Sequence, residues 1–208
     1  SLKSLDSHRA LSLGVSVVHQ DFALLPYLNV TENIFLGRLP QNSFGVVDWK
    51  KADEEAKAIL EQLRVRIPLH LSISHLSPGQ QQMTAIARAL SQKSEVLILD
   101  EPTARLSQNE VKRLFEVLRL LKQKGMGIIY ISHILEEVLK ISDRITVLKD
   151  GKKQGTVKTS ETNMDEIIRM MIGYAPQDLS KKKRMNTRNE EILSVRKLEK
   201  EGVFEDIS

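Results

Sequence analysis

The stretch Val96-Leu-Ile-Leu-Asp-Glu-Pro-Thr103 decides the fold of this chain. Its first four residues are apolar without alternation, which predicts a strand buried on both faces of a parallel sheet. Pro102 ends the strand, because proline has no N–H to donate to a neighbouring strand. Asp100 and Glu101 therefore lie at the carboxyl end of the strand, the edge where open α/β sheets bind their ligands.

The rest of the chain alternates strands with helices. Gly14-Val-Ser-Val-Val-His19, which ends at Gln20, and residues 127–131 are predicted to be two more buried strands. A hairpin is predicted over residues 144–158, around Asp150-Gly151. Apolar periodicity and capping residues predict helices over residues 48–63, 77–90, 109–124, 134–140 and 164–172. This order predicts right-handed crossovers and an α/β fold with a mainly parallel sheet.

Two helix ends are assigned from single residues. Thr31 is predicted to cap a short helix within residues 21–37, because its hydroxyl can accept a hydrogen bond from a free N–H. Gly125 is predicted to end the helix over residues 109–124, because glycine adopts the left-handed conformation that closes many helices.

The length and composition fit one globular domain with a substantial core, or one domain plus the edge of another. The chain has 208 residues, of which 41% are hydrophobic, and a net charge of +4. The lack of cysteine excludes a disulfide framework and a cysteine zinc site, and no apolar run is long enough to span a membrane. The basic run from Lys181 to Arg184 has no surrounding aromatic residues, which favours a solvated linker over nucleic-acid binding.

Asp100 and Glu101 can take different roles, because neighbouring side chains on a strand point in opposite directions. One carboxylate can hold Mg²⁺ through its water shell, and the other can orient or deprotonate an attacking water. The alternative is an acidic pair at the start of an ordinary turn. An apolar strand that ends in Asp-Glu-Pro-Thr favours the catalytic interpretation.

The segment Leu76-Ser-Pro-Gly-Gln-Gln-Gln82 predicts the start of a helix. Ser77 and Gln80 have the spacing of a capping box, and Pro78 falls at the first helical position. This pattern alone explains the segment as a well-made helix start. The same start offers free N–H groups to an anion, and Gly79 would let a phosphate come close. The acidic strand end elsewhere in the chain favours this second interpretation.

Two more polar residues follow predicted strands. His133 comes after one strand, and its imidazole can hydrogen-bond a phosphate oxygen or a water. Gln20 follows another strand, and its amide can contact Mg²⁺ or water. A lone histidine is more often a structural residue, and a single glutamine is a weak signal. Because the carboxyl ends of parallel strands meet at one edge, Gln20, Asp100, Glu101 and His133 are predicted to form one site.

The order of these motifs resembles the ATP-binding subunit of ABC transporters. The resemblance covers about residues 10–175 and rests on Gln20, the segment from Leu76, the acidic strand end and Ile131-Ser-His133. The stretch His19-Gln-Asp-Phe-Ala-Leu-Leu-Pro26, with residues 29–37, is similar to monosaccharide importers of the ribose, galactose and xylose type. The resemblance implies a partial P-loop NTPase-like α/β domain with an α-helical subdomain and a mainly parallel sheet core.

The resemblance implies a role for each residue at the strand ends. Gln20 would sense Mg²⁺ and couple to the membrane subunits. Asp100 would hold Mg²⁺ as the Walker B aspartate. Glu101 would be the catalytic glutamate and His133 the switch histidine. ATP and Mg²⁺ are the implied cofactors.

The helix start matches the family's signature motif, with departures. Ser77, Gly79 and Gln80 would contact the γ-phosphate of ATP held by the opposite ATPase domain. Pro78 stands where the family usually has glycine, and Ala104-Arg-Leu-Ser107 lacks the aspartate of the family's Asp-loop. No Gly-x-x-x-x-Gly-Lys-Ser/Thr phosphate loop occurs in the sequence. We therefore expect a piece that runs from after one phosphate loop to before the next. Such a piece is expected to bind ATP poorly and to hydrolyse none, and an ATPase assay at millimolar Mg-ATP tests this expectation.

The resemblance also divides the chain into segments. Residues 174–190 are polar, basic and without periodicity, and Ile192-Leu-Ser-Val195 begins a new strand pattern. The predicted segments are the end of a catalytic core (1–20), a helical subdomain (21–94), the catalytic core with the acidic pair and the histidine (95–173), a linker (174–190) and the first strands of a second ATPase domain (191–208).

Together these assignments predict the ATPase subunit of an importer that couples ATP hydrolysis to monosaccharide uptake, the sugar itself being undetermined. The implied partners are integral membrane permease subunits, a second ATPase domain in the same chain or a dimer, and indirectly a periplasmic or extracellular sugar-binding protein. No nucleic acid is expected, and the implied location is peripheral, on the cytoplasmic face of the cell membrane.

Two alternatives to this function remain. A soluble ABC ATPase not tied to transport should lack the segment Leu25-Pro-Tyr-Leu-Asn-Val-Thr-Glu-Asn33 that this chain has. The other is a catalytically inert ABC-like interaction module.

Overall fold

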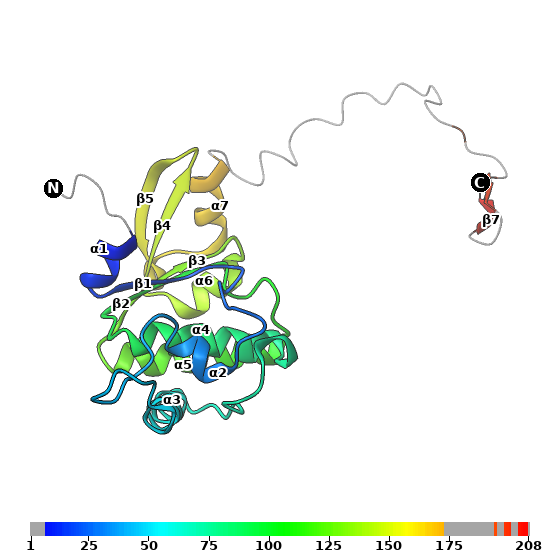
Figure 1. Cartoon of the computed structure of the whole chain (residues 1–208). Helices are drawn as coiled ribbons and strands as arrows, with labels where there is room; N and C mark the ends of the chain where they lie inside the picture. Colours follow the sequence, from blue (N-terminus) through cyan, green and yellow to red (C-terminus); the bar gives the residue numbers. More distant parts are fainter. Residues whose placement is uncertain (1–6, 173–193, 195–197, 201–203, 208) are drawn as a thin grey trace. The chain divides into compact units, whose positions relative to one another are not determined.

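A parallel sheet of three short strands carries the predicted motifs. The strands are β1 (Val15–Val18), β2 (Val96–Asp100) and β3 (Gly127–Ile131), in the order β1-β2-β3. Val18 lies beside Leu99, and Asp100 lies beside Ile131, so all three strands end at the same edge. The predicted α/β class with a parallel sheet is confirmed (Figure 1).

The computed structural model describes residues 7–172, 194, 198–200 and 204–207. The chain forms two units, the first made of Ser1–Ile145 and Lys158–Ser160 and the second of Thr146–Val157 and Glu161–Ser208. The five segments inferred from the motifs stay a prediction. In the described part of the chain, no helix combines the length and the apolar character that a membrane span requires.

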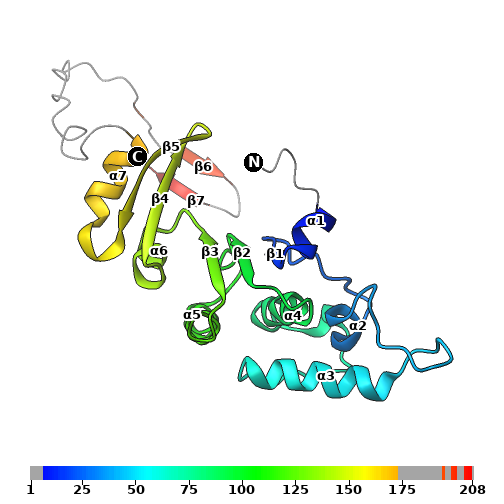
Figure 2. The ribbon, with the colours of Figure 1, turned by 90° about the vertical axis from the view of Figure 1, so that its left-hand side faces the viewer.

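Helices α4 and α5 pack against the sheet in the first unit. Helix α4 contacts β1, α5 contacts β3, and the two helices contact each other. Figure 2 shows them side by side below the sheet, with α3 farther from it. The helices of this unit are α1 (Ser7–Ser12), α2 (Val30–Ile34), α3 (Trp49–Gln62), α4 (Pro78–Ser91), α5 (Gln108–Gln123) and α6 (Leu135–Ile141), with a 3₁₀ turn at Ile73–His75.

The two faces of the sheet differ in burial. Leu97 and Leu99 of β2 are fully buried in the same core as residues of α4 and α5. On the opposite face, Ile129 is 50% exposed and Ile131 is 46% exposed. The prediction of burial on both faces concerned β2, whose opposite face at Val96 and Ile98 is only partly buried. The prediction that β3 is a buried strand is wrong for Ile129 and Ile131. The physical reason is that α4 and α5 cover the same face, which an apolar run in the sequence cannot reveal.

The short helix α2 begins at Asn29 rather than at Thr31. The Asn29 side chain accepts a hydrogen bond from the Glu32 N–H at 2.9 Å, and the Glu32 carboxylate accepts one from the Asn29 N–H at 2.7 Å. Thr31 lies inside the helix, where its buried hydroxyl donates to Asp53 at 2.6 Å. The prediction of Thr31 as the cap is wrong, because an N-cap needs the extended backbone that Asn29 has.

The longer helices begin and end close to the predicted residues. Asp48 caps α3 as predicted, and Ser77 and Gln80 form the predicted capping box of α4. Helix α5 starts one residue earlier than predicted, because Ser107 caps it. Gly125 follows the C-cap of α5 with a φ of 90°, a left-handed conformation that suits glycine.

The predicted hairpin and final helix are also present. Strands β4 (Arg144–Lys149) and β5 (Lys152–Lys158) pair across a turn in which Asp150 and Gly151 have φ values of 49° and 72°, as a type I′ turn requires. A 3₁₀ turn at Thr159–Glu161 precedes α7 (Met164–Ile172), and β6 (Leu198–Lys200) pairs with β7 (Phe204–Ile207). The predicted linker over residues 174–190 lies outside the described residues, as does all of the stretch 192–195 except Ser194.

Candidate functional site

The residues predicted to converge follow the three strand ends. Asp100 is the last residue of β2, while Gln20 lies two residues beyond β1 and His133 two residues beyond β3. The parallel register brings these strand ends to one edge of the sheet. Gln20 is exposed there, and in the part of the chain that the structure describes no hydrogen bond links it to the other three residues.

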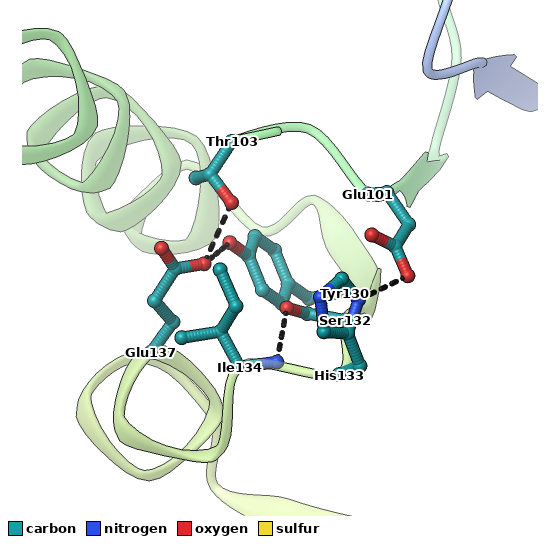
Figure 3. Close-up of polar contacts among 7 residues, drawn as sticks. All are labelled: Glu101, Thr103, Tyr130, Ser132, His133, Ile134 and Glu137. Carbon is teal, nitrogen blue, oxygen red and sulfur yellow. Dashed lines mark hydrogen bonds and ion pairs between the residues drawn. The ribbon is translucent and has the colours of Figure 1, made fainter. Parts of the chain in front are cut away.

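Glu101 and His133 are in direct contact. His133 Nδ1 lies 2.7 Å from Glu101 Oε1, and Figure 3 shows the carboxylate directed at the imidazole. An ionised carboxylate only accepts hydrogen bonds, so Nδ1 is the donor. The side chains of Glu101 and His133 are 28% and 71% exposed, so both remain open to a ligand. Such a pair at an open sheet edge can orient and deprotonate a water.

The backbone at Glu101 is unusual. Its φ of 47° lies in the left-handed region, which costs a non-glycine residue about 1–2 kcal/mol. The Glu101 N–H donates to the carbonyl of Ile131 at 2.9 Å, which ties the end of β2 to the end of β3. Strain of this kind persists only where neighbouring contacts enforce it.

Asp100 has the chemistry of a ligand for a divalent cation. Its carboxylate is half-buried and makes no hydrogen bond or ion pair with any described residue. Mg²⁺ prefers carboxylate and amide oxygens, so Asp100 and Gln20 fit the predicted ion. The described residues contain no group of three or more His, Cys, Asp or Glu side chains able to hold a metal ion. A sparse donor set suits Mg²⁺, which often combines one or two carboxylates with substrate phosphates.

The start of α4 forms a second group of predicted residues. Ser77 Oγ accepts from the Gln80 N–H at 3.3 Å, and Gln80 Oε1 accepts from the Ser77 N–H at 3.0 Å. Pro78 lies in the first turn, and Ser77 is exposed at the surface. Among the described residues, no hydrogen bond or ion pair joins this group to Glu101 or His133.

Glu110 of α5 contacts the start of α4, a role that the sequence did not predict. Its Oε1 accepts hydrogen bonds from Ser77 Oγ and from the Gly79 N–H, both at 2.9 Å. Its Oε2 accepts from the N–H and the hydroxyl of Ser107, at 2.9 and 2.8 Å. The hydrogen bond from the Ser107 backbone, followed by those from the Ser107 and Ser77 hydroxyls and the Gly79 N–H, lowers the pKa of Glu110. One carboxylate thus joins the starts of α4 and α5.

The space beside Gly79 is occupied by this carboxylate. A Cβ atom added to Gly79 would lie 2.4 Å from Glu110 Oε1, so no side chain fits there without displacing Glu110. An open pocket of about 240 Å³ is lined in part by Ser77, Gly79, Gln80, Arg66 and Arg113. The room that the sequence suggested for a phosphate is therefore taken by a carboxylate, with an open pocket beside it that Arg66 and Arg113 help to line.

The sequence of this chain is similar to those of known proteins. A family model described as ABC transporter matches residues 1–104. A ribose import ATP-binding protein of Geobacillus kaustophilus is 44% identical over 196 residues, which cover 94% of this chain and 40% of that protein. One from Lactococcus lactis subsp. lactis is 48% identical over 169 residues, covering 81% of this chain and 34% of that protein. A putative ribose/galactose/methyl galactoside import ATP-binding protein of Rhizobium meliloti is 39% identical over 199 residues, covering 96% of this chain and 39% of that protein. The chain thus spans about two fifths or less of the length of these relatives.

Solved structures share the fold. An ATP-binding cassette of an ABC transporter in its ADP conformation has a TM-score of 0.69 at 22% identity, covering 83% of this chain and 74% of that one. A dimeric cassette in a post-hydrolysis state, bound to ADP and Pi, has a TM-score of 0.61 at 24% identity, covering 75% of this chain and 68% of that one. At this level of identity the likeness concerns the fold alone.

Proposed function

The chain belongs to the ABC transporter family, and on that premise we propose that it forms part of the ATPase subunit of an importer that couples ATP hydrolysis to monosaccharide uptake. Relatives named for ribose import, or for ribose, galactose and methyl galactoside import, match most of its length. The observation that supports the catalytic part is the 2.7 Å contact between His133 Nδ1 and Glu101 Oε1 at the ligand edge of the sheet.

Glu101 is the group proposed to orient and deprotonate the attacking water. The hydrogen bond from His133 holds Oε1, while Oε2 has no partner among the described residues and is free to accept a hydrogen bond from water. His133 therefore aims the carboxylate in this proposal, and its exposed imidazole can also reach a phosphate oxygen.

Asp100 and Gln20 are proposed to supply side-chain oxygens to Mg²⁺. The ion, when bound with ATP, neutralises charge on the phosphate oxygens. Asp100 suits this role because its half-buried carboxylate is unpartnered among the described residues, and Gln20 because its exposed amide lies at the same sheet edge.

Ser77, Gly79 and Gln80 are proposed to contact the γ-phosphate of ATP bound by a second ATPase domain, in the same chain or in a dimer. The Ser77 hydroxyl and the Gly79 N–H donate to Glu110 in this structure. A phosphate oxygen would therefore take the place of the carboxylate oxygen, exchanging one anion for another.

The proposed partners are integral membrane permease subunits, with a periplasmic or extracellular sugar-binding protein acting through them. The proposed location is peripheral, on the cytoplasmic face of the membrane. Leu25 and Tyr27 follow Gln20 closely and are 44% and 92% exposed, which supports contact with another protein at this surface.

The test is a chimera in which this chain replaces the matching 196 residues of the Geobacillus relative. We expect the chimera to hydrolyse ATP, and Glu101→Gln and His133→Ala each to lower kcat by about 100-fold or more. Glu116→Gln, on the exposed side of α5, serves as the matched control. A chimera that binds ATP but turns over equally well with Glu101→Gln would contradict the proposal, and one that binds ATP without any turnover would favour an inert module.

A further inference from the structure

Three polar side chains next to the Glu101–His133 pair have no role in the proposed function. They are Thr103, Tyr130 and Glu137 (Figure 3). Glu137 Oε2 accepts a hydrogen bond from Thr103 Oγ1 at 2.8 Å and another from Tyr130 Oη at 2.7 Å. One carboxylate oxygen therefore joins two side chains that are distant in the sequence.

Each of these side chains comes from a segment that carries the pair. Thr103 follows Glu101 by two residues, in the turn after β2. Tyr130 lies on β3, three residues before His133, and Glu137 lies on α6, four residues after His133. The network fastens the turn that holds Glu101 to the strand and the helix that flank His133.

Both donors are themselves held in place. Thr103 is only 6% exposed. The Tyr130 ring packs edge-on against Phe115 of α5, with ring centroids 6.1 Å apart and planes at 78°. Burial, and next the hydrogen bond to Glu137, raise the pKa of Tyr130, so its hydroxyl keeps the proton that it donates. Loss of the Glu137 carboxylate would leave two partly buried donors without an acceptor, which is unfavourable.

We propose that Glu137 is a positioning residue that keeps the Glu101 carboxylate within hydrogen-bonding distance of His133. The effect of Glu137 on hydrolysis rests on the proposed function, whereas its effect on the contact between Glu101 and His133 does not. Glu101 adopts a left-handed backbone with a φ of 47°, so the direction of its side chain depends on how the following turn is anchored. The Glu101 N–H is held by the carbonyl of Ile131. The bond from Thr103 to Glu137 anchors the turn that follows. When this bond is lost, the turn can relax to an ordinary φ and carry the carboxylate away from Nδ1.

The first test is made on the 208-residue chain by NMR, with the ¹⁵N chemical shift of His133 Nδ1 as the readout of its bond to Glu101. We expect Glu137→Ala to shift this resonance as far as Glu101→Ala does. Glu137→Gln should leave it near the wild-type position, because the amide oxygen can accept from both donors. The matched control is Glu136→Ala, the neighbouring acid, whose exposed side chain lies 4.0 Å from Lys140.

The second test measures kcat and KM for ATP in the chimera. We expect Glu137→Ala to lower kcat by about 10-fold with little change in KM, because a displacement of about 1 Å in a reacting group is costly. Thr103→Val removes the anchoring bond and should lower kcat about as much as Glu137→Ala, whereas Tyr130→Phe leaves that bond in place and should lower kcat less. Urea unfolding of each variant separates this effect from a loss of folded protein.

Two results would overturn the inference. One is a His133 resonance that Glu137→Ala leaves unchanged while Glu101→Ala shifts it. The other is an equal effect of Glu137→Ala and Glu136→Ala on kcat. An unchanged His133 resonance in Glu137→Ala refutes only the positioning role of Glu137. Hydrolysis that survives Glu101→Gln instead refutes the proposed function and says nothing against that role.

Discussion

Replacing Glu110 by alanine should weaken the joint between the starts of α4 and α5. The change removes two hydrogen bonds to α4, from Ser77 Oγ and the Gly79 N–H, and two to the capping residue Ser107. Charge-assisted bonds reach about 1.5–3 kcal/mol when shielded from water. Glu110 is only partly buried, so water can hydrogen-bond the donors that lose the carboxylate. The loss of unfolding free energy should therefore resemble that of a lost helix cap. We expect destabilisation by about 1 kcal/mol at pH 7.

The pH dependence has a defined sign. The hydrogen bonds lower the pKa of Glu110 below its ordinary value of 4.5. A carboxyl group whose pKa is depressed by folding stabilises the folded state above its unfolded pKa, and this contribution is lost as the pH falls through the folded pKa. The difference in unfolding free energy between wild type and Glu110→Ala should therefore be constant near neutral pH and shrink below about pH 4.5.

The assay is urea unfolding followed by circular dichroism between pH 7 and pH 4. Glu116→Ala is the matched control on the same helix, since the one interaction of Glu116 with another described side chain is an exposed ion pair with Arg113 at 3.1 Å. Its expected cost is about 0.3–0.5 kcal/mol or less. Equal effects of the two variants at pH 7, or a Glu110 effect that does not change with pH, would refute the reasoning.

The Gly79 amide offers a second readout of the same variant. Its N–H donates to Glu110 in the structure, so Glu110→Ala should shift its NMR resonance. With this donor and the Ser77 hydroxyl released, pyrophosphate should perturb the Gly79 resonance at lower concentration than in the wild type. An unchanged response to pyrophosphate would mean that Glu110 does not compete with a phosphate there.

Two further predictions concern the sheet and the first capped helix. Leu99→Ala should cost about 3 kcal/mol in urea unfolding, because Leu99 is fully buried, whereas Ile129→Ala should cost about 1 kcal/mol or less, because half of its side chain is exposed; similar losses would contradict the one-sided burial. Asn29→Ala should cost about 1 kcal/mol through loss of the α2 cap, and Asn29→Asp should restore most of it. Equal stability of the two Asn29 variants would argue against the cap.

The elements and most of their ends were predictable because their signals are local. Apolar runs identified β1, β2 and β3, the cap Asp48 located α3, and the capping pair Ser77 and Gln80 located α4. Thr31 was wrongly predicted as the cap because the helix begins two residues earlier, at Asn29, and only the extended backbone of Asn29 reveals this.

The sequence by itself determined which polar residues follow the strand ends, since parallel strands carry that information in their order. Only the tertiary structure decided which side chains meet. Glu110 lies 33 residues from Ser77, and Glu137 lies 34 residues from Thr103, so neither contact leaves a periodic signal. The one-sided burial of the sheet was also decided there, because coverage by α4 and α5 depends on how helices pack, whereas an apolar strand has the same composition whichever of its faces is covered.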